Sequence, residues 1–261
     1  MTAQYETVNY EKRGRRAIVT LNRPDHRNAI TGLMMHELVE VLMHAAADEE
    51  LLVLLLTGAG NDFCPGADLR HYTTGDARKD KPLTDREFLI PTLLHEMNCV
   101  TVAAIHGACA GAGLGWAAAC DLRFASESAR FNTAFLDVAV AGDMGLPWSL
   151  PRLLGASKAR ELSFLPHKFD AQEAERIGLV SRVFEHDDFG AEIEGIVERL
   201  AGSAPLALRN LKKHYVEAER IDFGDFISLE AERHMRIFQS EDTREAFSAY
   251  LEKRKPDFKG R

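Results

Sequence analysis

The chain has 261 residues, of which 46% are apolar, and a formal net charge of −8 at pH 7. A chain of this length and composition can bury a sizeable core, and one α/β domain followed by a tail is expected. Because no basic stripe accompanies the negative charge, we expect no nucleic-acid partner. The first residues, "MTAQYETVNYEKRGRR", lack the apolar region of a secretory signal.

The sequence indicates neither a metal site nor a membrane partner. The four cysteines, Cys64, Cys99, Cys109 and Cys120, show no CxxC spacing and no histidine at metal-site spacing. We therefore expect reduced thiols in a cytoplasmic protein. The longest apolar run without a charge, residues 99–120, is interrupted by glycines and predicts two separate elements, not a membrane span.

In the first half of the chain, strands and helices are predicted to alternate. Residues 17–22 alternate in polarity, and the apolar runs 51–58 and 100–107 indicate strands buried on both faces. Thr31 is placed to cap a helix that continues to about Ala47, with Leu33 among the residues on its apolar face. Helices are also expected at 89–98 and 111–121, a polar loop at 62–83, and short strands within 122–132.

From Ser157 onward the sequence is predicted to be helical. The segment 170–178 begins with Asp170 and carries Glu173, a capping-box pattern, and Gly178 can end it. The other helices are expected at 157–165, 189–202, 205–220 and from about 240 to 253. Strand–helix alternation followed by helices is typical of an α/β fold.

Two loops that follow buried strands have the composition of a ligand-binding backbone. "PGAD" (65–68) follows the predicted strand at 51–58, and "GACAGAG" (107–113) follows the predicted strand at 100–105. Small residues let a ligand approach the main chain, and N–H groups at a helix start lack partners within the helix. Two such groups facing one point would form an oxyanion hole, whereas tight packing of helix on strand is the alternative. A dinucleotide fingerprint is excluded, because residues 111–115 read GxGxG.

One acidic residue, Asp143, lies in the otherwise apolar stretch "VAVAGDMGLPW" (138–148). A carboxylate in such surroundings has a raised pKa, which suits a base that holds a proton briefly. Alternatively, Asp143 caps a helix that begins near Leu146 or stabilises a turn. The residues alone leave both interpretations open.

Five segments together resemble the enoyl-CoA hydratase/isomerase (crotonase) family, in order and spacing, over nearly the whole chain. They are "LNRPDHRNAI", "GAGNDFCPGADL", "HGACAGAGLGWAAACDLRFAS", "LPRLLGASKARELSFL" and "AQEAERIGLVSRVF". The resemblance implies a crotonase-like spiral of ββα units in residues 1–200 and a helical trimerisation region in residues 201–261. It also implies an acyl-CoA thioester as substrate, no cofactor beyond that CoA, and a homotrimer or hexamer.

The resemblance implies that the backbone N–H groups of Ala67 and Ala112 hold the thioester oxygen. Two departures from the family are informative. The glutamates that bind and activate water in its hydratases match Gly115 and Phe135 here. Hydration needs a positioned base and an acid, and neither residue supplies one. The hydratase activity of the family is therefore less expected for this chain.

Asp143 matches the aspartate of another branch, which includes dienoyl-CoA isomerases and ring-epoxide isomerases and in which this residue moves protons on the acyl chain. A 1,3 double-bond shift needs one base and an oxyanion hole, without a second acid. We therefore expect an enoyl-CoA isomerase that forms a thioester enolate. The alternatives are a hydratase with atypical acids, an enzyme that opens or closes a ring on an acyl-CoA, and a non-catalytic acyl-CoA-binding trimer.

For CoA, the resemblance points to the loop "RPDHRNA" (23–29). Arg23 and Arg27 would meet the phosphates, and the backbone carbonyl groups of Ala29 and Pro65 would meet the adenine. Each arginine could instead be a solvated surface charge.

Further binding residues are expected near the first loop and at the C-terminus. Asp68 follows a hole donor and is expected to hold its loop by accepting backbone N–H bonds. His71 and Tyr72, within "HYTTGDARKD", could line the acyl pocket. By the same resemblance, Phe258 and Lys259 would reach the CoA of a neighbouring subunit.

Four other residues are weaker candidates for the chemistry. Asp137 is the reserve acid, because it lies six residues before Asp143. His106 is expected to pack beside the second loop, and Asp121 to accept backbone N–H bonds. Cys64 lies beside the first donor but has no visible basic partner to make it a thiolate.

Overall fold

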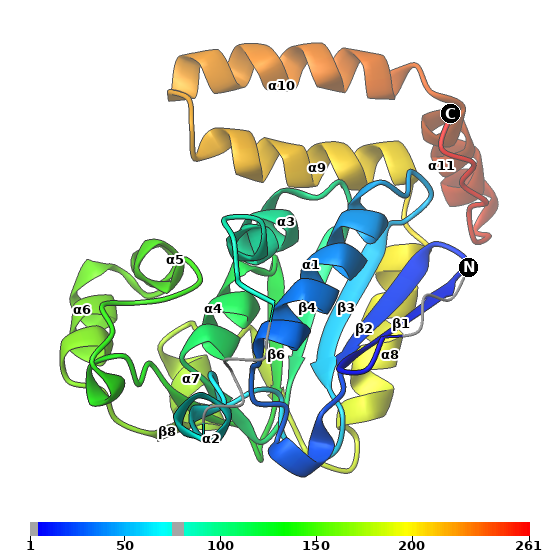
Figure 1. Ribbon diagram of the computed structural model, residues 1–261. Coiled ribbons are helices and arrows are strands. Elements are labelled where there is room, and N and C mark those ends of the chain that lie inside the picture. Colours follow the sequence, from blue (N-terminus) through cyan, green and yellow to red (C-terminus); the bar gives the residue numbers. More distant parts are fainter. Residues whose placement is uncertain (1–4, 75–80) are drawn as a thin grey trace.

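The structure, a computed structural model, describes residues 5–74 and 81–261. Its centre is a six-stranded sheet with the strand order β1-β2-β3-β4-β6-β9 (Figure 1). The strands are β1 (Val8–Arg13), β2 (Arg16–Leu21), β3 (Val53–Gly58), β4 (Val100–Ile105), β6 (Leu122–Ser126) and β9 (Arg182–Phe184). β1 pairs antiparallel with β2 and the other pairs are parallel. The carboxyl ends of β3 and β4 therefore lie at the same edge of the sheet.

A second sheet, in the order β5-β7-β8, contains three short strands. They are β5 (Ala108–Ala110), β7 (Arg130–Asn132) and β8 (Phe169–Asp170). From β4 onward the chain passes between the two sheets: β4 belongs to the first and β5 to the second, and α4 (Ala112–Ala119) follows them. This ββα arrangement confirms the predicted α/β, crotonase-like spiral.

Helices cover both faces of the large sheet. α1 (Gly32–Ala46), α3 (Ile90–Glu96) and α4 lie on one face, and α8 (Phe189–Ala201) lies on the other (Figure 1). Alternate residues of β3 serve the two cores: Leu54 and Leu56 pack on the α1 side, and Val53 and Leu55 pack on the α8 side. Burial on both faces explains why this strand reads as an unbroken apolar run.

α1 begins where it was predicted to begin, because the Thr31 hydroxyl accepts a hydrogen bond from the Met34 N–H at 3.3 Å. Leu38 and Leu42 of this helix are buried. The prediction that Leu33 lies on the same face is wrong, since this residue is 39% exposed. It precedes Met34 by one position, which turns it about 100° around the helix, away from the core.

The second half of the chain is mostly helical, as predicted, although the short strands β8 and β9 also lie in it. Asp170 caps α7 (Ala171–Arg176) by accepting from the Glu173 N–H at 2.9 Å, and Gly178, with φ 84°, follows its end. The helices before the C-terminal group are α5 (Leu146–Leu154), α6 (Ala156–Phe164) and α7 (Ala171–Arg176). In the loop predicted at 62–83, a short helix, α2 (Leu69–Thr73), is present, and residues 75–80 lie outside the described part of the chain.

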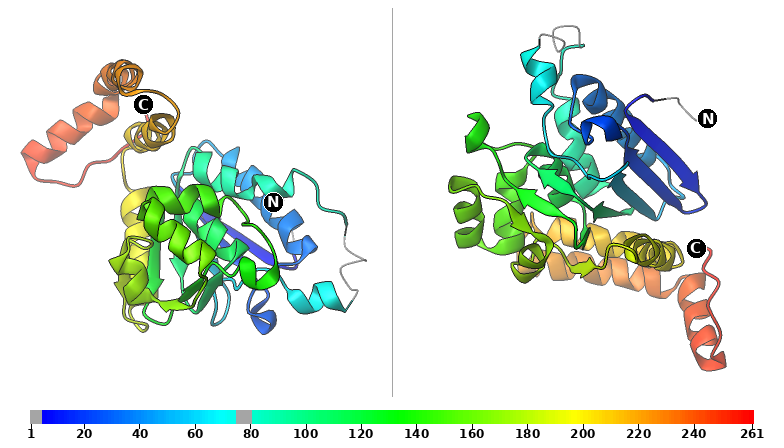
Figure 2. Two further views of the ribbon diagram at one scale, coloured as in Figure 1. Left: turned by 90° about the vertical axis from the view of Figure 1, so that its left-hand side faces the viewer. Right: turned by 90° about the horizontal axis from the view of Figure 1, so that it is seen from below.

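The first of three C-terminal helices packs against α3 and β4, and the other two lie farther from the sheet (Figure 2). The three helices are α9 (Pro205–Ala218), α10 (Phe223–Phe238) and α11 (Glu241–Glu252). α10 and β1 were not among the predicted elements. Nothing tests the boundary at residue 200, which stays a prediction. Within the described residues, no helix is both long enough and apolar enough to cross a membrane.

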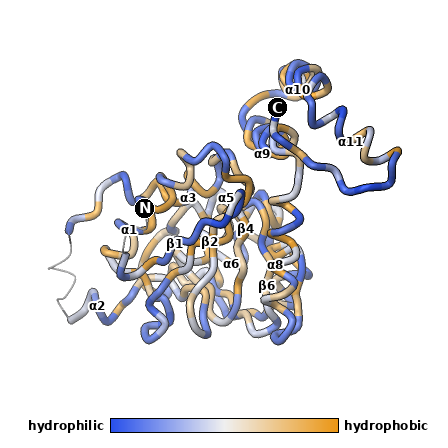
Figure 3. Tube along the Cα trace, turned by 90° about the vertical axis from the view of Figure 1, so that its right-hand side faces the viewer, coloured by the Kyte–Doolittle hydropathy of each residue, from blue (hydrophilic) through white to orange (hydrophobic). Residues whose placement is uncertain are grey.

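Apolar and polar residues alternate along the length of α9, α10 and α11 (Figure 3). Large apolar side chains that these helices leave exposed are Leu211, Tyr215, Phe223, Met235, Phe238, Phe247, Tyr250 and Leu251. A protein surface rarely carries so many large apolar groups in one region unless another surface covers them.

Candidate active site

The two glycine-containing loops lie side by side beyond the carboxyl ends of β3 and β4. The backbones of Cys64 and Cys109 pair in an isolated parallel β-bridge, and both thiols are free. The Cys64 N–H donates to the Ala108 carbonyl at 2.8 Å, and the Ala110 N–H donates to the Cys64 carbonyl at 3.0 Å. A Cβ on Gly113 would lie 2.5 Å from the Cys64 carbonyl oxygen, so only glycine lets α4 approach this loop.

The predicted hole donors adjoin each other across these loops. A Cβ on Gly66, which has φ 96°, would lie 3.7 Å from the Cα of Gly111, and a Cβ on Gly111 would lie 3.9 Å from the Cα of Gly66. Ala67 and Ala112 each follow one of these two glycines directly. The loops therefore carry the two expected donors on neighbouring stretches of backbone.

The local backbone directs the N–H groups of Ala67 and Ala112, the two predicted donors, away from the hydrogen bonds of the neighbouring residues. On one edge of the first loop, the Ile30 N–H donates to Gly66 at 2.8 Å and the Asp68 N–H donates to Ile30 at 2.9 Å. In such a parallel pairing, the intervening Ala67 directs its own N–H to the opposite edge. Ala112 is the first residue of α4, and N–H groups in a first turn have no partner within the helix.

Asp62 joins the second loop to the predicted CoA loop. Its Oδ1 accepts from the Ala108 N–H at 2.7 Å and from Arg27 Nη2 at 3.0 Å, and its Oδ2 accepts from Arg27 Nε at 2.8 Å. The hydrogen bond from Arg27 outweighs burial and holds the pKa of Asp62 below its ordinary value. Asp62 therefore favours its ionised form and holds the two loops together.

Asp68 ties the first loop to the same segment. Arg23 Nη2 lies 3.0 Å from Asp68 Oδ2, and a second nitrogen of Arg23 donates to the Ala29 carbonyl. Asp68 Oδ1 caps α2 by accepting from the His71 N–H at 3.1 Å, as expected for a loop-holding residue. Although burial raises it, these bonds bring the pKa of Asp68 below its ordinary value.

Among the predicted CoA residues, Arg27 is the more exposed arginine, with 63% of its side chain accessible against 15% for Arg23. Pro65 is half-buried beside the first loop. Their roles toward CoA stay predictions. Sequence reasoning missed both arginine–aspartate pairs, since nothing local indicates that Arg27 meets a residue 35 positions away.

Asp143 lies in a tight turn between Gly142, with φ 121°, and Met144, with φ 47°. Burial raises the pKa of its carboxyl group, opposed by one hydrogen bond from the Met144 N–H to Oδ1 at 2.8 Å. Within the described residues no cation pairs with it. The helix-cap interpretation is wrong: Gly145 is the N-cap of α5, and Leu146 bonds to the backbone carbonyl of Asp143 at 3.0 Å.

The turn that carries Asp143 packs against α4, the helix whose first residue is Ala112. A Cβ on Gly115 would lie 2.6 Å from the Met144 Cβ and 3.2 Å from the Asp143 carbonyl oxygen. Gly115 lies three residues after Ala112, so this turn packs within one helical turn of the start of α4. Phe135, the second residue that was predicted to replace a water-activating glutamate, is 5% exposed and belongs to the core.

The weaker candidates are accounted for by other contacts. His106 Nε2 lies 3.1 Å from the Gly60 carbonyl, and burial lowers its pKa. Asp121 Oδ2 accepts from the Thr101 N–H at 2.7 Å, as expected. Burial raises the pKa of Cys64 to about 12, which keeps it a neutral thiol. Asp137 is exposed.

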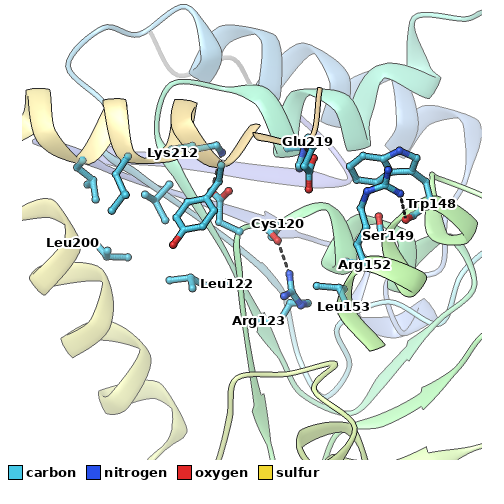
Figure 4. A pocket seen from close by; sticks show the side chains of 17 residues that line it. Cys120, Leu122, Arg123, Trp148, Ser149, Arg152, Leu153, Leu200, Lys212 and Glu219 are labelled. Atoms are coloured by element: carbon cyan, nitrogen blue, oxygen red, sulfur yellow. Dashed lines mark hydrogen bonds and ion pairs between the residues drawn. The ribbon is translucent and has the colours of Figure 1, made fainter. Parts of the chain in front are cut away.

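One cavity of about 490 Å³ lies beneath α9, between that helix, α5 and the start of β6 (Figure 4). Arg152 stacks on Trp148, 3.8 Å from the ring centre. The buried Lys212 ammonium group bonds to the Cys99 carbonyl at 2.9 Å and to Asp121 Oδ2 at 2.8 Å. Among the described residues that line this cavity, neither hole donor is present, nor is Asp143. This cavity lies between α9 and the core and is separate from the candidate site.

The C-terminal tail folds back on its own chain. The buried Asp242 accepts from the N–H groups of Lys259 at 2.6 Å and Gly260 at 2.8 Å. The Phe258 carbonyl accepts from Arg15 Nη2 at 2.9 Å. The side chain of Lys259 is 55% exposed and pairs with Asp257. Contact of Phe258 or Lys259 with a neighbouring subunit stays a prediction.

Comparison with known proteins gives a consistent result. Residues 12–261 match the family model described as enoyl-CoA hydratase/isomerase. The chain is 33% identical over 98% of its length, and 99% of the relative, to a probable enoyl-CoA hydratase of Rhodobacter capsulatus. It is 30% identical to a peroxisomal Delta(3,5)-Delta(2,4)-dienoyl-CoA isomerase of Arabidopsis thaliana, over 91% of the chain and 90% of that protein. A crystal structure of a putative enoyl-CoA hydratase from Streptomyces coelicolor superposes with a TM-score of 0.91, at 31% identity, covering 100% of this chain and 97% of that one.

Proposed function

The chain belongs to the enoyl-CoA hydratase/isomerase family, and on that premise we propose that it is an enoyl-CoA isomerase with Asp143 as its proton shuttle. The observation that carries this proposal is the packing of the Asp143 turn on Gly115 of α4. One carboxyl group, with a raised pKa, lies in a turn that packs against the helix beginning with Ala112. That set is sufficient for a double-bond shift.

The proposed reaction starts from a 3-enoyl-CoA. The thioester oxygen accepts hydrogen bonds from the N–H groups of Ala67 and Ala112. Asp143 removes a proton from C2, and the electron pair moves onto the thioester oxygen as an enolate, which the two N–H groups stabilise. The protonated Asp143 then returns the proton at C4, and the double bond forms between C2 and C3. Substrate and product are isomers, so neither water nor a cofactor is consumed.

The electrostatics of Asp143 suit this role. A base works best when its pKa lies near the working pH, because the ionised form is then present and still attracts protons strongly. Burial moves the pKa of Asp143 in that direction. Asp62 and Asp68 have lowered pKa values and hydrogen-bonded oxygens, so they are poorer bases.

Hydration is the second candidate, because relatives of the chain include proteins described as hydratases. Against it stand Gly115 and Phe135, which offer no group that could activate water. A ring-transforming reaction or binding without catalysis would use the same hole but a different acyl group or no base.

The proposal is tested by incubating the protein with 3-hexenoyl-CoA and following the absorbance of the conjugated 2-enoyl thioester. We expect a sustained rise in the wild-type protein. Addition of a separate hydratase should then consume the product, which confirms its identity. If 3-hexenoyl-CoA stays unchanged while hexanoyl-CoA binds normally, the isomerase proposal fails and a binding role or another acyl group is indicated.

We also propose that the chain assembles as a trimer or hexamer through α9, α10 and α11. The exposed apolar side chains of these helices support this assembly. In it, Arg23 and Arg27 would meet the CoA phosphates, Ala29 and Pro65 the adenine, and Phe258 and Lys259 the CoA of a neighbour.

Sedimentation at micromolar concentration should show a trimer or a larger species. Lys259→Ala should weaken hexanoyl-CoA binding measured by calorimetry, because one cation near the phosphates is lost. A stable monomer would contradict the assembly and with it the shared CoA site.

A further inference from the structure

We propose that Met144 is a positioning residue that holds the Asp143 carboxyl group toward the oxyanion hole, and that Gly115 lacks a side chain because Met144 fills its place. This inference rests on the proposed role of Asp143 as the base. It assigns a positioning role to Gly115 and Met144, neither of which contacts substrate in the proposed reaction.

The contact between Gly115 and Met144 is unusually close. A Cβ added to Gly115 would lie 2.6 Å from the Met144 Cβ, 3.0 Å from the Met144 carbonyl oxygen and 3.2 Å from the Asp143 carbonyl oxygen. None of these atoms is the far end of a flexible side chain, so none can turn away without moving the backbone. Any side chain at position 115 must therefore displace the turn.

Met144 adopts a backbone conformation that favours glycine. Its φ is 47°, in the left-handed region that is unfavourable for a residue with a Cβ. Its side chain is only 6% exposed and belongs to the main core cluster. A methionine in this conformation is explained if its buried side chain anchors the turn, which glycine could not do.

The other side of the turn is fixed in the same way. Gly142 has φ 121°, and a Cβ there would lie 2.6 Å from the Cγ of Pro147. Gly145 also has a positive φ, 73°. Asp143 thus stands between two close contacts, one to α4 through Met144 and one to α5 through Pro147.

This packing connects the Asp143 turn to the helix that begins with Ala112. The Met144 N–H donates to Asp143 Oδ1 at 2.8 Å, so a movement of Met144 moves the carboxyl group directly. Gly115 lies three residues after Ala112 in the same helix. A shift of the turn at the Gly115–Met144 contact would therefore change the position of the carboxyl group relative to the start of α4.

Gly115→Ala tests this inference. We expect the rate of deuterium incorporation from D₂O into 3-hexenoyl-CoA to fall about 10- to 100-fold, because small misplacements of a reacting group have effects of this size. Hexanoyl-CoA affinity should change no more than a few-fold. The pH midpoint of the rate should also move lower, because a displaced turn admits water to Asp143 and reduces its desolvation. A residue with only a structural role would leave that midpoint in place.

Gly195→Ala is the matched control. Gly195 also lies in a helix, but a Cβ there would meet nothing within 4 Å. The same chemical change should leave the exchange rate and its pH midpoint at wild-type values.

A double-mutant cycle addresses the case in which Gly115→Ala folds poorly. Met144→Gly suits the positive φ and removes the atom nearest to the new Cβ, although it also loses the anchoring side chain. If the contact acts as proposed, Gly115→Ala combined with Met144→Gly loses less rate than the two single losses multiplied together. Met144→Ala alone, which keeps the N–H group, should also lower the rate and shift the pH midpoint downward.

Two outcomes separate this inference from the proposed function. If Asp143→Asn abolishes exchange while Gly115→Ala and Met144→Ala both retain the wild-type rate and pH midpoint, the positioning role is wrong and the isomerase proposal stands. If Asp143→Asn itself exchanges at the wild-type rate, the proposed function fails, whatever the Gly115 variants do.

Discussion

The two sides of the candidate site are built by different physical means. On the oxyanion-hole side, ion pairs and hydrogen bonds hold the loops: Arg27 and the Ala108 N–H both bind Asp62, and Arg23 binds Asp68. On the acid side, the turn with Asp143 is held by close packing, and the hydrogen bond recorded for that carboxyl group comes from the adjacent Met144 N–H.

The difference follows from what each side must do. A backbone N–H donor neither gains nor loses a proton in the reaction, so strong polar bonds can fix its loop without impairing it. A carboxyl base must gain and lose a proton, and bonds to its ionised form would lower its pKa and weaken it as a base. The pKa values agree, since Asp62 and Asp68 lie below their ordinary range and Asp143 lies above it.

The largest expected effect concerns water. If the acid side holds a single carboxyl group, crotonyl-CoA should be hydrated slowly, because loss of one acid–base group typically costs about 10²–10⁴-fold in rate. Loss of the enoyl absorbance of crotonyl-CoA measures this. Turnover equal to that of a hydratase with two glutamates would show that the acid side contains a further acid–base group besides Asp143.

A smaller effect is expected from breaking the polar side. Asp62→Ala removes the acceptor of the Ala108 N–H and the partner of Arg27. We expect a loss of about 1–3 kcal/mol in the free energy of unfolding, as for other unsatisfied polar groups, together with reduced activity. Urea denaturation would measure it. Asp25→Ala, at an exposed residue of the same CoA loop, is the control and should unfold like the wild type.

The smallest effect is a difference in how stability depends on pH. Burial raises the pKa of Asp143 in the folded state, so its ionisation opposes folding. This cost is absent at acidic pH, where the group is protonated in both states, and grows as pH rises through the folded-state pKa. Asp143→Asn should therefore melt with the wild type in acid and slightly above it at neutral pH. A variant that melts lower at neutral pH would indicate a stabilising, structural Asp143.

Local sequence patterns predicted where the two glycine-containing loops lie, whereas the roles of Ala67 and Ala112 stay predictions. Glycine and alanine after two buried strands identified both loops, and burial on two faces identified β3 and β4. The ion pairs that fix those loops could not be predicted, because Arg27 and Asp62 are 35 positions apart and each alone resembles a surface charge.

The acid side was predictable only in part. The apolar neighbours of Asp143 indicated a raised pKa, and the structure agrees. The contact between Gly115 and Met144 could not be inferred, since a helical glycine gives no sign of its distant neighbour. α10 and β1 were missed for a related reason: both are largely exposed, so neither has a clear apolar periodicity.

The central claim, that Asp143 is the base of a site with one carboxyl group, is tested most directly by proton exchange. Wild type and Asp143→Asn are incubated with 3-hexenoyl-CoA in D₂O, and deuterium at C2 and C4 is measured by mass spectrometry. Asparagine keeps the size of the side chain and an oxygen for the Met144 N–H while it removes the basicity. We expect exchange in the wild type, almost none in the variant, and hexanoyl-CoA affinity within a few-fold between the two. Exchange at the wild-type rate in Asp143→Asn would contradict the account and direct attention to Asp137 and His106.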